Sequence, residues 1–208
     1  MTKNPTKIVL LFGALFLATL MGSYIYNTTT PVGENVKPLK DLGGPFELNS
    51  VNGNVSLDQF KGNIVVLYFG FLNCAEVCPS SMGTLSAAFS RLSPATYQHV
   101  QGLFVSVDPE RDDLVSLNKF AKYFDDRVIG LTGTNQQIEA LTKQYGVYFD
   151  IVDMESSELS YTVDHSSRFY IIDDTGKLVG AMSHNTTPVE LAAGIERIYE
   201  KTIAKNRR

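Results

Sequence analysis

The two cysteines of the chain, Cys74 and Cys78, lie in one short stretch with the sequence FLNCAEVCPSS (residues 71–81). A thiolate can attack a disulfide bond or bind a soft metal ion. Three residues separate these cysteines, whereas thiol–disulfide enzymes commonly have two between theirs. Because side chains four positions apart project from the same side of a helical turn, both sulfurs could reach one ion. The pair could be a structural disulfide, a thiol–disulfide redox centre or a metal site.

These three roles make different demands on the rest of the chain. A disulfide is the usual fate of two cysteines outside the cytoplasm, but this one would close a very small loop and add comparatively little stability. Two sulfurs alone suit Cu(I), and a histidine nitrogen beside them would widen the range of copper oxidation states that the site accepts. The metal role therefore depends on an available histidine.

The chain has three histidines. His99 precedes an expected strand in a polar connection, where we expect it to be solvated, and His184 lies in the loop before the last expected helix. His165 directly precedes an expected buried strand. It is flanked by an aspartate and two serines (residues 164, 166 and 167), which could orient its ring as the partners of metal-bound histidines do. His165 is the candidate third ligand, and a hydrogen-bonded loop histidine is the alternative.

The elements around the cysteines predict how the pair is positioned. Residues 63–72 (NIVVLYFGFL) are too apolar for a half-exposed strand and indicate a central strand buried on both faces. Pro79 fits the first turn of a helix, which we expect to continue over residues 80–92. The cysteines would then lie at the carboxyl end of a strand and the amino end of a helix. The helix dipole at such a position lowers a cysteine pKa, and open α/β sheets bind ligands along this edge.

The remaining pattern predicts an α/β sandwich with a mixed sheet. Expected strands cover residues 102–109, 127–133 and 147–153, with a hairpin at 168–173 and 177–183; expected helices cover residues 112–124, 134–146 and 187–204. We assign residues 46–204 to this one domain and residues 205–208 to a basic tail. Within the domain, Arg111 and Asp112 are expected to open a helix.

The amino-terminal segment has the pattern of a membrane anchor. Lys3 and Lys7 precede residues 8–26, which carry no charge, and a helix of that length spans about 28 Å, close to the hydrocarbon core of a bilayer. The alternative is a cleaved secretory signal, although a convincing cleavage site is not evident. We favour a transmembrane helix over residues 1–26, followed by a linker rich in proline and glycine over residues 27–45. Both interpretations place the domain outside the cytoplasm.

The charge distribution excludes one class of partner. Residues 27–200 contain all 22 acidic residues but only 12 of the 18 basic ones, which gives this part of the chain a net charge of −10. An acidic domain without a basic stripe is not expected to bind nucleic acid.

Three blocks of sequence resemble the SCO/SenC family: CAEVCP (residues 74–79), SVDPERD (residues 106–112) and VDHSSRFYIID (residues 163–173), in this order after one hydrophobic segment. The resemblance covers roughly residues 40–205. It implies a thioredoxin-like α/β/α fold and a copper-binding protein that assists assembly of the dinuclear copper centre of cytochrome c oxidase. The implied partners are subunit II of that oxidase, or a similar apoprotein, and a copper donor protein.

The resemblance also implies site residues. The copper ligands would be Cys74, Cys78 and His165, holding one copper per chain, and Asp108 is a possible accessory residue or simply part of a turn. Whether the protein is an enzyme stays open, because the same cysteines could reduce the disulfide of a partner with or without the metal. Two positions depart from the family pattern, since Asn73 and Ala75 stand where members often have histidine and proline. The implied location is a bacterial inner membrane, with the domain in the periplasm.

Overall fold

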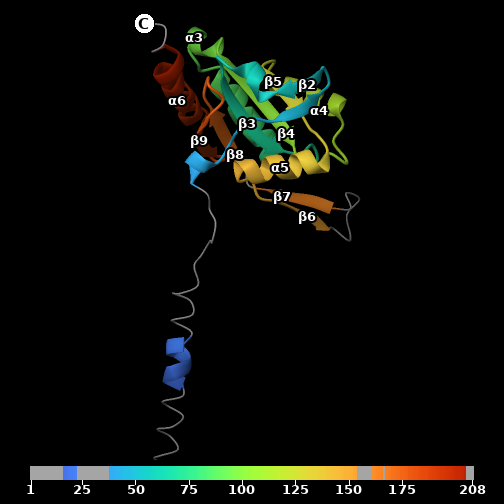
Figure 1. Ribbon diagram of the computed structural model, residues 1–208, viewed down its shortest axis with the longest axis vertical. Coiled ribbons are helices and arrows are strands. Elements are labelled where there is room, and N and C mark those ends of the chain that lie inside the picture. The colour runs from blue at the N-terminus through green and yellow to red at the C-terminus, as the bar shows by residue number, and fades with distance from the viewer. Residues whose placement is uncertain (1–15, 23–37, 154–160, 166, 205–208) are drawn as a thin grey trace, which may run out of the picture. The chain divides into compact units, whose positions relative to one another are not determined.

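The computed structural model describes residues 16–22, 38–153, 161–165 and 167–204, with the backbone alone described at residues 150–153 and 161–165. The chain divides into two units, Met1–Val36 and Lys37–Arg208, and Figure 1 shows the larger one as a layered α/β domain. The small unit contributes a helical segment at residues 16–22 with exposed apolar side chains. No helix among the described residues is both long and apolar enough to cross a bilayer. Residues 1–15 and 23–26 of the expected membrane segment lie outside the described part.

A five-stranded mixed sheet forms the centre of the large unit, in the order β5-β4-β3-β8-β9. Strands β3 (Ile64–Gly70), β4 (Val100–Ser106) and β5 (Val128–Leu131) run parallel, while β8 (Arg168–Ile172) and β9 (Leu178–Ser183) are antiparallel to their neighbours. The central strand β3 has the sequence IVVLYFG and is buried along its whole length, as its run of β-branched and aromatic residues predicts.

Alternation along β3 divides the core into two layers, because successive side chains of a strand point to opposite faces. Ile64, Val66 and Tyr68 join the cluster that includes residues of the helices on one face, α2 (Val77–Phe89), α4 (Leu114–Phe124) and α6 (Pro188–Tyr199). Val65, Leu67 and Phe69 join the other cluster. That second cluster includes residues of the hairpin β1 (Glu47–Ser50) and β2 (Gly53–Ser56) and of helix α5 (Asn135–Tyr145). The expected sandwich with a mixed sheet is therefore confirmed.

Local signals fix the ends of the helices. Thr134 and Thr187 each cap a helix through a capping box, with Gln137 and Glu190 as the reciprocal partners, and Pro188 occupies the first position of α6. Gly146 ends α5 in the left-handed conformation, at φ 66°. These six positions explain why the two helices begin or end where the sequence predicts.

The structure also contains elements that the pattern did not predict. These are the β1–β2 hairpin, the short helix α3 (Pro94–Tyr97), the 3₁₀ turns at Leu39–Asp41 and Leu57–Phe60, and the strand β7 (Tyr161–His165). The helix expected over residues 187–204 is present as α6 followed by a π-helical turn, Glu200–Ala204. Strand β7 pairs with β6 (Phe149–Asp153) in a separate two-stranded sheet. Figure 1 shows this hairpin outside the main sheet.

Candidate metal and redox site

The cysteine pair lies where the loop after β3 enters α2. Cys74 belongs to the loop, and Cys78 is the second residue of the helix. The backbone N–H of Cys78 donates a hydrogen bond to the Cys74 sulfur at 3.3 Å, and both cysteines are free thiols. The helix thus begins at Val77, before the proline at which we expected it to start. The tertiary structure brings both sulfurs to the amino end of one helix, as predicted.

The two thiols differ in exposure. Cys78 is fully buried, whereas Cys74 is half-buried and packs against both core clusters at the end of the sheet. Gly70, the last residue of β3, makes room for the buried thiol. A Cβ atom at Gly70 would lie 2.8 Å from the Cys78 sulfur and 2.8 Å from the Phe104 ring. A glycine is therefore required for the strand and the thiol to come so close.

The expectation of a lowered pKa is wrong for Cys78. Its interaction with the Cys74 side chain and its burial raise the pKa of the Cys78 thiol above the ordinary value. Desolvation disfavours the thiolate, and a charge on the neighbouring sulfur disfavours a second one. The helix amino end does not overcome these two effects. Cys74, which accepts the amide hydrogen bond and reaches the surface, is the more accessible thiol of the pair.

Tyr68 is a site residue that the sequence reasoning missed. Its hydroxyl interacts with the side chains of Ser81 and Ser167 and with the Cys78 thiol. Burial raises the pKa of Tyr68 above its usual value. One signal was available, because Tyr68 is the only residue of the buried strand β3 with a polar side chain, and a buried tyrosine hydroxyl usually finds a partner.

Asp112 anchors the loop that carries the cysteines. Its Oδ2 atom accepts the backbone N–H of Leu72 at 2.9 Å and the hydroxyl of Ser106 at 2.6 Å, and its side chain is buried. Asp113, not Asp112, caps α4 by accepting the N–H groups of Val115 and Ser116. The expectation that Arg111 and Asp112 open the helix is therefore wrong. Asp112 instead connects the end of β4 to the loop two residues before Cys74.

Asp108 lies at the same carboxyl edge of the sheet. The backbone N–H of Val107 donates to Gly70 O at 2.8 Å, which brings the segment that follows β4 against the end of β3. The Asp108 carboxylate is buried and pairs with Arg111 at 2.6 Å, and its carbonyl accepts the N–H of Asp112. Asp108 thus forms the expected turn, and its accessory role toward a metal stays a prediction.

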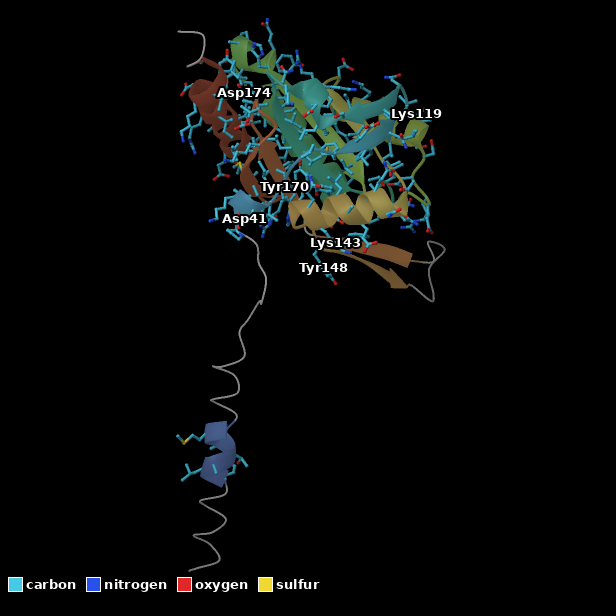
Figure 2. The ribbon with its side chains drawn as sticks, in the orientation of Figure 1. Asp41, Lys119, Lys143, Tyr148, Tyr170 and Asp174 are labelled. Carbon is cyan, nitrogen blue, oxygen red and sulfur yellow. The ribbon has the colours of Figure 1, made fainter. Side chains whose placement is uncertain are left out.

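The backbone of His165 is described, but its side chain lies outside the described residues. His165 ends β7 and pairs with Phe149 at the base of the β6–β7 hairpin, next to Tyr148, which projects outward from the domain (Figure 2). Among the described side chains, no group of three or more histidine, cysteine or acidic residues is arranged to hold a metal ion. The set of Cys74, Cys78 and His165 therefore stays a prediction.

The other two histidines have structural surroundings. His99, which we expected in solvent, is half-buried and stacks on Tyr199 with the ring centroids 5.9 Å apart. The backbone of His184 donates to Ser167 O at 3.2 Å, next to the end of β9.

Fold and site together define a class: an α/β domain with a mixed sheet that presents two free thiols at the amino end of a helix. The sequence model of the SCO1/SenC family matches residues 34–200. The chain belongs to the SCO1/SenC family, and the resemblance drawn from the three sequence blocks is confirmed.

Two relatives show how the chain compares in length. It is 37% identical over 161 residues to the mitochondrial protein SCO2 of Saccharomyces cerevisiae, covering 77% of this chain and 52% of the yeast protein. It is 31% identical over 201 residues to a SCO2-like protein of Rickettsia felis, covering 92% of this chain and 96% of the rickettsial one. The chain therefore spans about half the length of the mitochondrial relative and nearly all of the bacterial one.

Solved structures agree with the fold. Arabidopsis thaliana ScoI with copper bound superposes with a TM-score of 0.71 at 32% identity, covering 77% of this chain and 99% of that one. BsSco superposes with a TM-score of 0.61 at 27% identity, covering 79% and 96%. BsSco is described as a member of the Sco family of cytochrome c oxidase assembly proteins and as having a disulfide switch.

Proposed function

We propose that this protein binds one copper ion through Cys74, Cys78 and His165 and delivers it during assembly of the copper centre of cytochrome c oxidase. The observation that carries the proposal is the pair of free thiols at the start of α2, with the Cys78 amide donating to the Cys74 sulfur at 3.3 Å. Two sulfur ligands close together suit Cu(I), and a nitrogen ligand would extend the site to Cu(II). The copper-bound plant relative supports the same cargo.

The chain path supports His165 as the third ligand. Phe169 of β8 pairs with Tyr68 of β3, two residues before that strand ends. Since consecutive residues span at most about 3.6 Å each, the Cα atom of His165 lies within about 14 Å of that of Phe169. The Ser167 side chain also interacts with the Tyr68 hydroxyl, which interacts with Cys78. The segment after His165 therefore leads to the cysteine pair.

The proposed ligand set suits transfer rather than storage. Two thiolates and one imidazole leave a coordination position of copper open or weakly filled. A cysteine or histidine of the receiving apoprotein can enter that position before the ligands of this protein leave. We propose subunit II of the oxidase as the receiver and a separate copper protein as the donor. Asp108, at the same sheet edge, would assist the metal or the partner.

The free thiols also favour a second function, reduction of a disulfide in the partner. The Cys74 thiolate would attack the partner disulfide, and Cys78 would then resolve the mixed disulfide. The partner gains two electrons and two protons, and this protein is left with a Cys74–Cys78 disulfide. The disulfide switch of BsSco supports this reading. Because oxidation removes both thiolate ligands, the same step would abolish copper binding.

We further propose that residues 8–26 anchor the protein in a bacterial inner membrane, with the domain in the periplasm. The uncharged segment after Lys3 and Lys7 supports the orientation, and the match along nearly the whole rickettsial relative supports a bacterial setting.

Anaerobic copper titration of the full chain tests the first function. We expect about one copper per chain and the loss of tight Cu(II) binding in Cys74→Ser, Cys78→Ser and His165→Ala. His184→Ala is the matched control and should bind copper like the unchanged protein. Unchanged copper stoichiometry in all three ligand variants would contradict the proposal.

Reduction of a disulfide-containing peptide by the copper-free chain tests the second function. We expect both serine variants to stop the reaction and His165→Ala to spare it. A His165→Ala variant that still reduces the peptide, together with an unchanged protein that binds no copper, would leave disulfide reduction as the function.

A further inference from the structure

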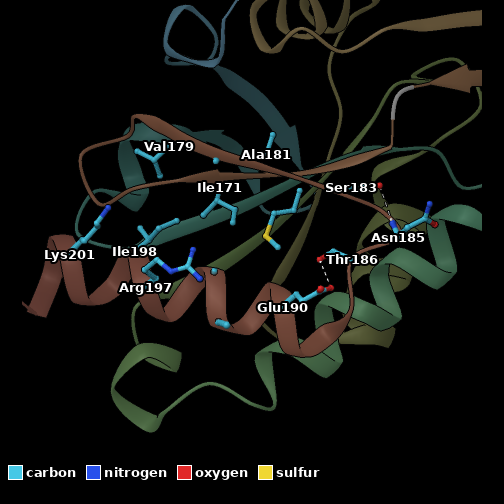
Figure 3. A pocket seen from close by; sticks show the side chains of 14 residues that line it. Ile171, Val179, Ala181, Ser183, Asn185, Thr186, Glu190, Arg197, Ile198 and Lys201 are labelled. Atoms are coloured by element: carbon cyan, nitrogen blue, oxygen red, sulfur yellow. Dashed lines mark hydrogen bonds between the residues drawn. The ribbon is translucent and has the colours of Figure 1, made fainter.

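A groove away from the cysteines runs between β9 and α6. It has a volume of about 790 Å³. Figure 3 shows β9 along one side of the groove, α6 along the other, and Ile171 of β8 between them. Gly180 on β9 and Gly194 on α6 line the groove and have no side chains that would narrow it. A Cβ atom at Gly194 would lie 3.2 Å from the Met182 sulfur. The groove therefore has an apolar middle part around Ile171 and Met182, and polar and charged side chains line its ends.

One wall of the groove is the edge strand β9, whose pairing with β8 is interrupted by a register shift between Ile171 and Ile172. Strand β9 has the sequence LVGAMS, without a charge or a proline, although natural edge strands commonly carry such residues. The opposite edge strand, β5, is extended by a bridge from Thr132 to Asn49. On β9, the turn at Leu39–Asp41 packs nearby, and Gly43 approaches Leu178 at the start of the strand. Among the described residues, no backbone hydrogen bond from an element other than β8 reaches residues 179–182.

Two cations lie at one end of the groove. Arg197 and Lys201 lie four residues apart on α6 and its extension, both line the groove, and both are exposed. Within the described part of the chain, neither forms an ion pair. At the other end, Glu190 is held by the N–H and hydroxyl of Thr187 in the capping box. The end of the groove at Arg197 and Lys201 is therefore positively charged, although the net charge of the domain is negative.

From these observations we propose that the groove binds an extended acidic peptide segment of a partner protein by strand addition to β9. Backbone groups of the segment would pair with the open edge of β9, and alternate apolar side chains would enter the groove against Met182 and Ile171. Acidic side chains at one end of the segment would pair with Arg197 and Lys201. The available backbone edge favours a peptide over other anionic molecules with apolar parts.

A defined peptide tests this surface on the full chain. The probe is an end-blocked octapeptide of alternating valine and threonine that ends in two glutamates, with a counterpart that ends in two lysines. We expect the glutamate peptide to bind at least about fivefold more tightly. Its binding should slow hydrogen exchange of β9 amides. N-methylation of every backbone amide of the peptide should abolish binding, because all donors that could pair with β9 are then lost.

Charge reversal provides the second arm. The double variant Arg197→Glu, Lys201→Glu should bind the glutamate peptide about tenfold more weakly. Lys119→Glu is the matched control and should bind it unchanged, because Lys119 lies on α4, on the opposite side of the domain (Figure 2). Equal binding of the two peptides would overturn the proposal. So would binding of palmitate without the peptide, or self-association of the chain that the double variant abolishes.

Discussion

The Oδ2 atom of Asp112 accepts the backbone N–H of Leu72 at 2.9 Å, across forty positions of sequence. The same oxygen accepts the Ser106 hydroxyl at 2.6 Å. A single buried carboxylate thus holds the start of the cysteine loop against the end of β4. The position of Cys74 therefore depends on a residue outside the proposed ligand set.

Removing the Asp112 carboxylate should loosen the loop. Hydrogen bonds to a charged group contribute about 1.5–3 kcal/mol each, so Asp112→Ala should lower the free energy of unfolding by about 3 kcal/mol and weaken copper binding. Asp112→Asn keeps an acceptor oxygen for both donors. It should therefore retain most of the unfolding free energy and most of the copper affinity. Urea unfolding and copper titration measure the two effects. An alanine variant as stable as the unchanged protein would show that the loop does not need this anchor.

The same carboxylate should make stability depend on pH. Burial raises the pKa of Asp112, although the hydrogen bonds from Ser106 and Leu72 oppose the shift. The folded state then binds the proton more tightly than the unfolded chain. This contribution to stability is complete below the unfolded pKa of about 3.9 and is lost as pH rises through the higher folded value. Asparagine does not titrate, so the Asp112→Asn variant does not lose this stabilisation as the pH rises. Its unfolding free energy relative to that of the unchanged protein should therefore increase from pH 4 to pH 8. A constant difference in unfolding free energy would contradict this.

Gly70 should not tolerate a side chain. Gly70→Ala would place a methyl group 2.8 Å from the Cys78 sulfur, and such overpacking costs about 1–3 kcal/mol. We expect lower unfolding free energy and weaker copper binding. Gly83→Ala is the control, because a Cβ atom at Gly83 in α2 meets nothing within 4 Å. That change should stabilise the helix by about 0.5–1 kcal/mol. Equal behaviour of the two variants would mean that the strand moves away from the thiol.

The two thiols should react with iodoacetamide at different rates. Cys74 is half-buried and accepts an amide hydrogen bond, whereas Cys78 is fully buried and its pKa is raised by Cys74 and by burial. At pH 8 we expect Cys74 to be modified at least about tenfold faster. Peptide mapping after timed alkylation of the reduced protein measures the ratio. Faster modification of Cys78 would show that α2 opens readily at its first turn.

Tyr68→Phe should change the reduction potential of bound copper but not the number of copper ions bound per chain. The Tyr68 hydroxyl interacts with Cys78, and hydrogen bonds to ligand sulfurs tune the reduction potential of a metal. We expect about one copper per chain and a lower copper reduction potential, measured by voltammetry. A variant with unchanged potential and unchanged absorption would mean that the hydroxyl serves only Ser81 and Ser167.

Much of this architecture was predictable because its signals are local. A run of buried residue types predicted β3, and capping residues predicted the ends of α5 and α6. The β1–β2 hairpin was missed because its four-residue strands carry little periodicity. Strand β7 was missed because its pairing with β6 depends on residues that follow a long polar connection.

The sequence by itself determined the family, the cysteine pair as the reactive centre, and the strand and helix that bring both sulfurs together. These follow from residue types and spacings within a few positions of one another. Only the tertiary structure decided the surroundings of the pair: the raised pKa of the Cys78 thiol, the role of Gly70, the Tyr68 hydroxyl beside it and the anchoring of Leu72 by Asp112. Burial and contacts between residues far apart in the sequence set these properties. Residue types and spacings within a short stretch predict neither.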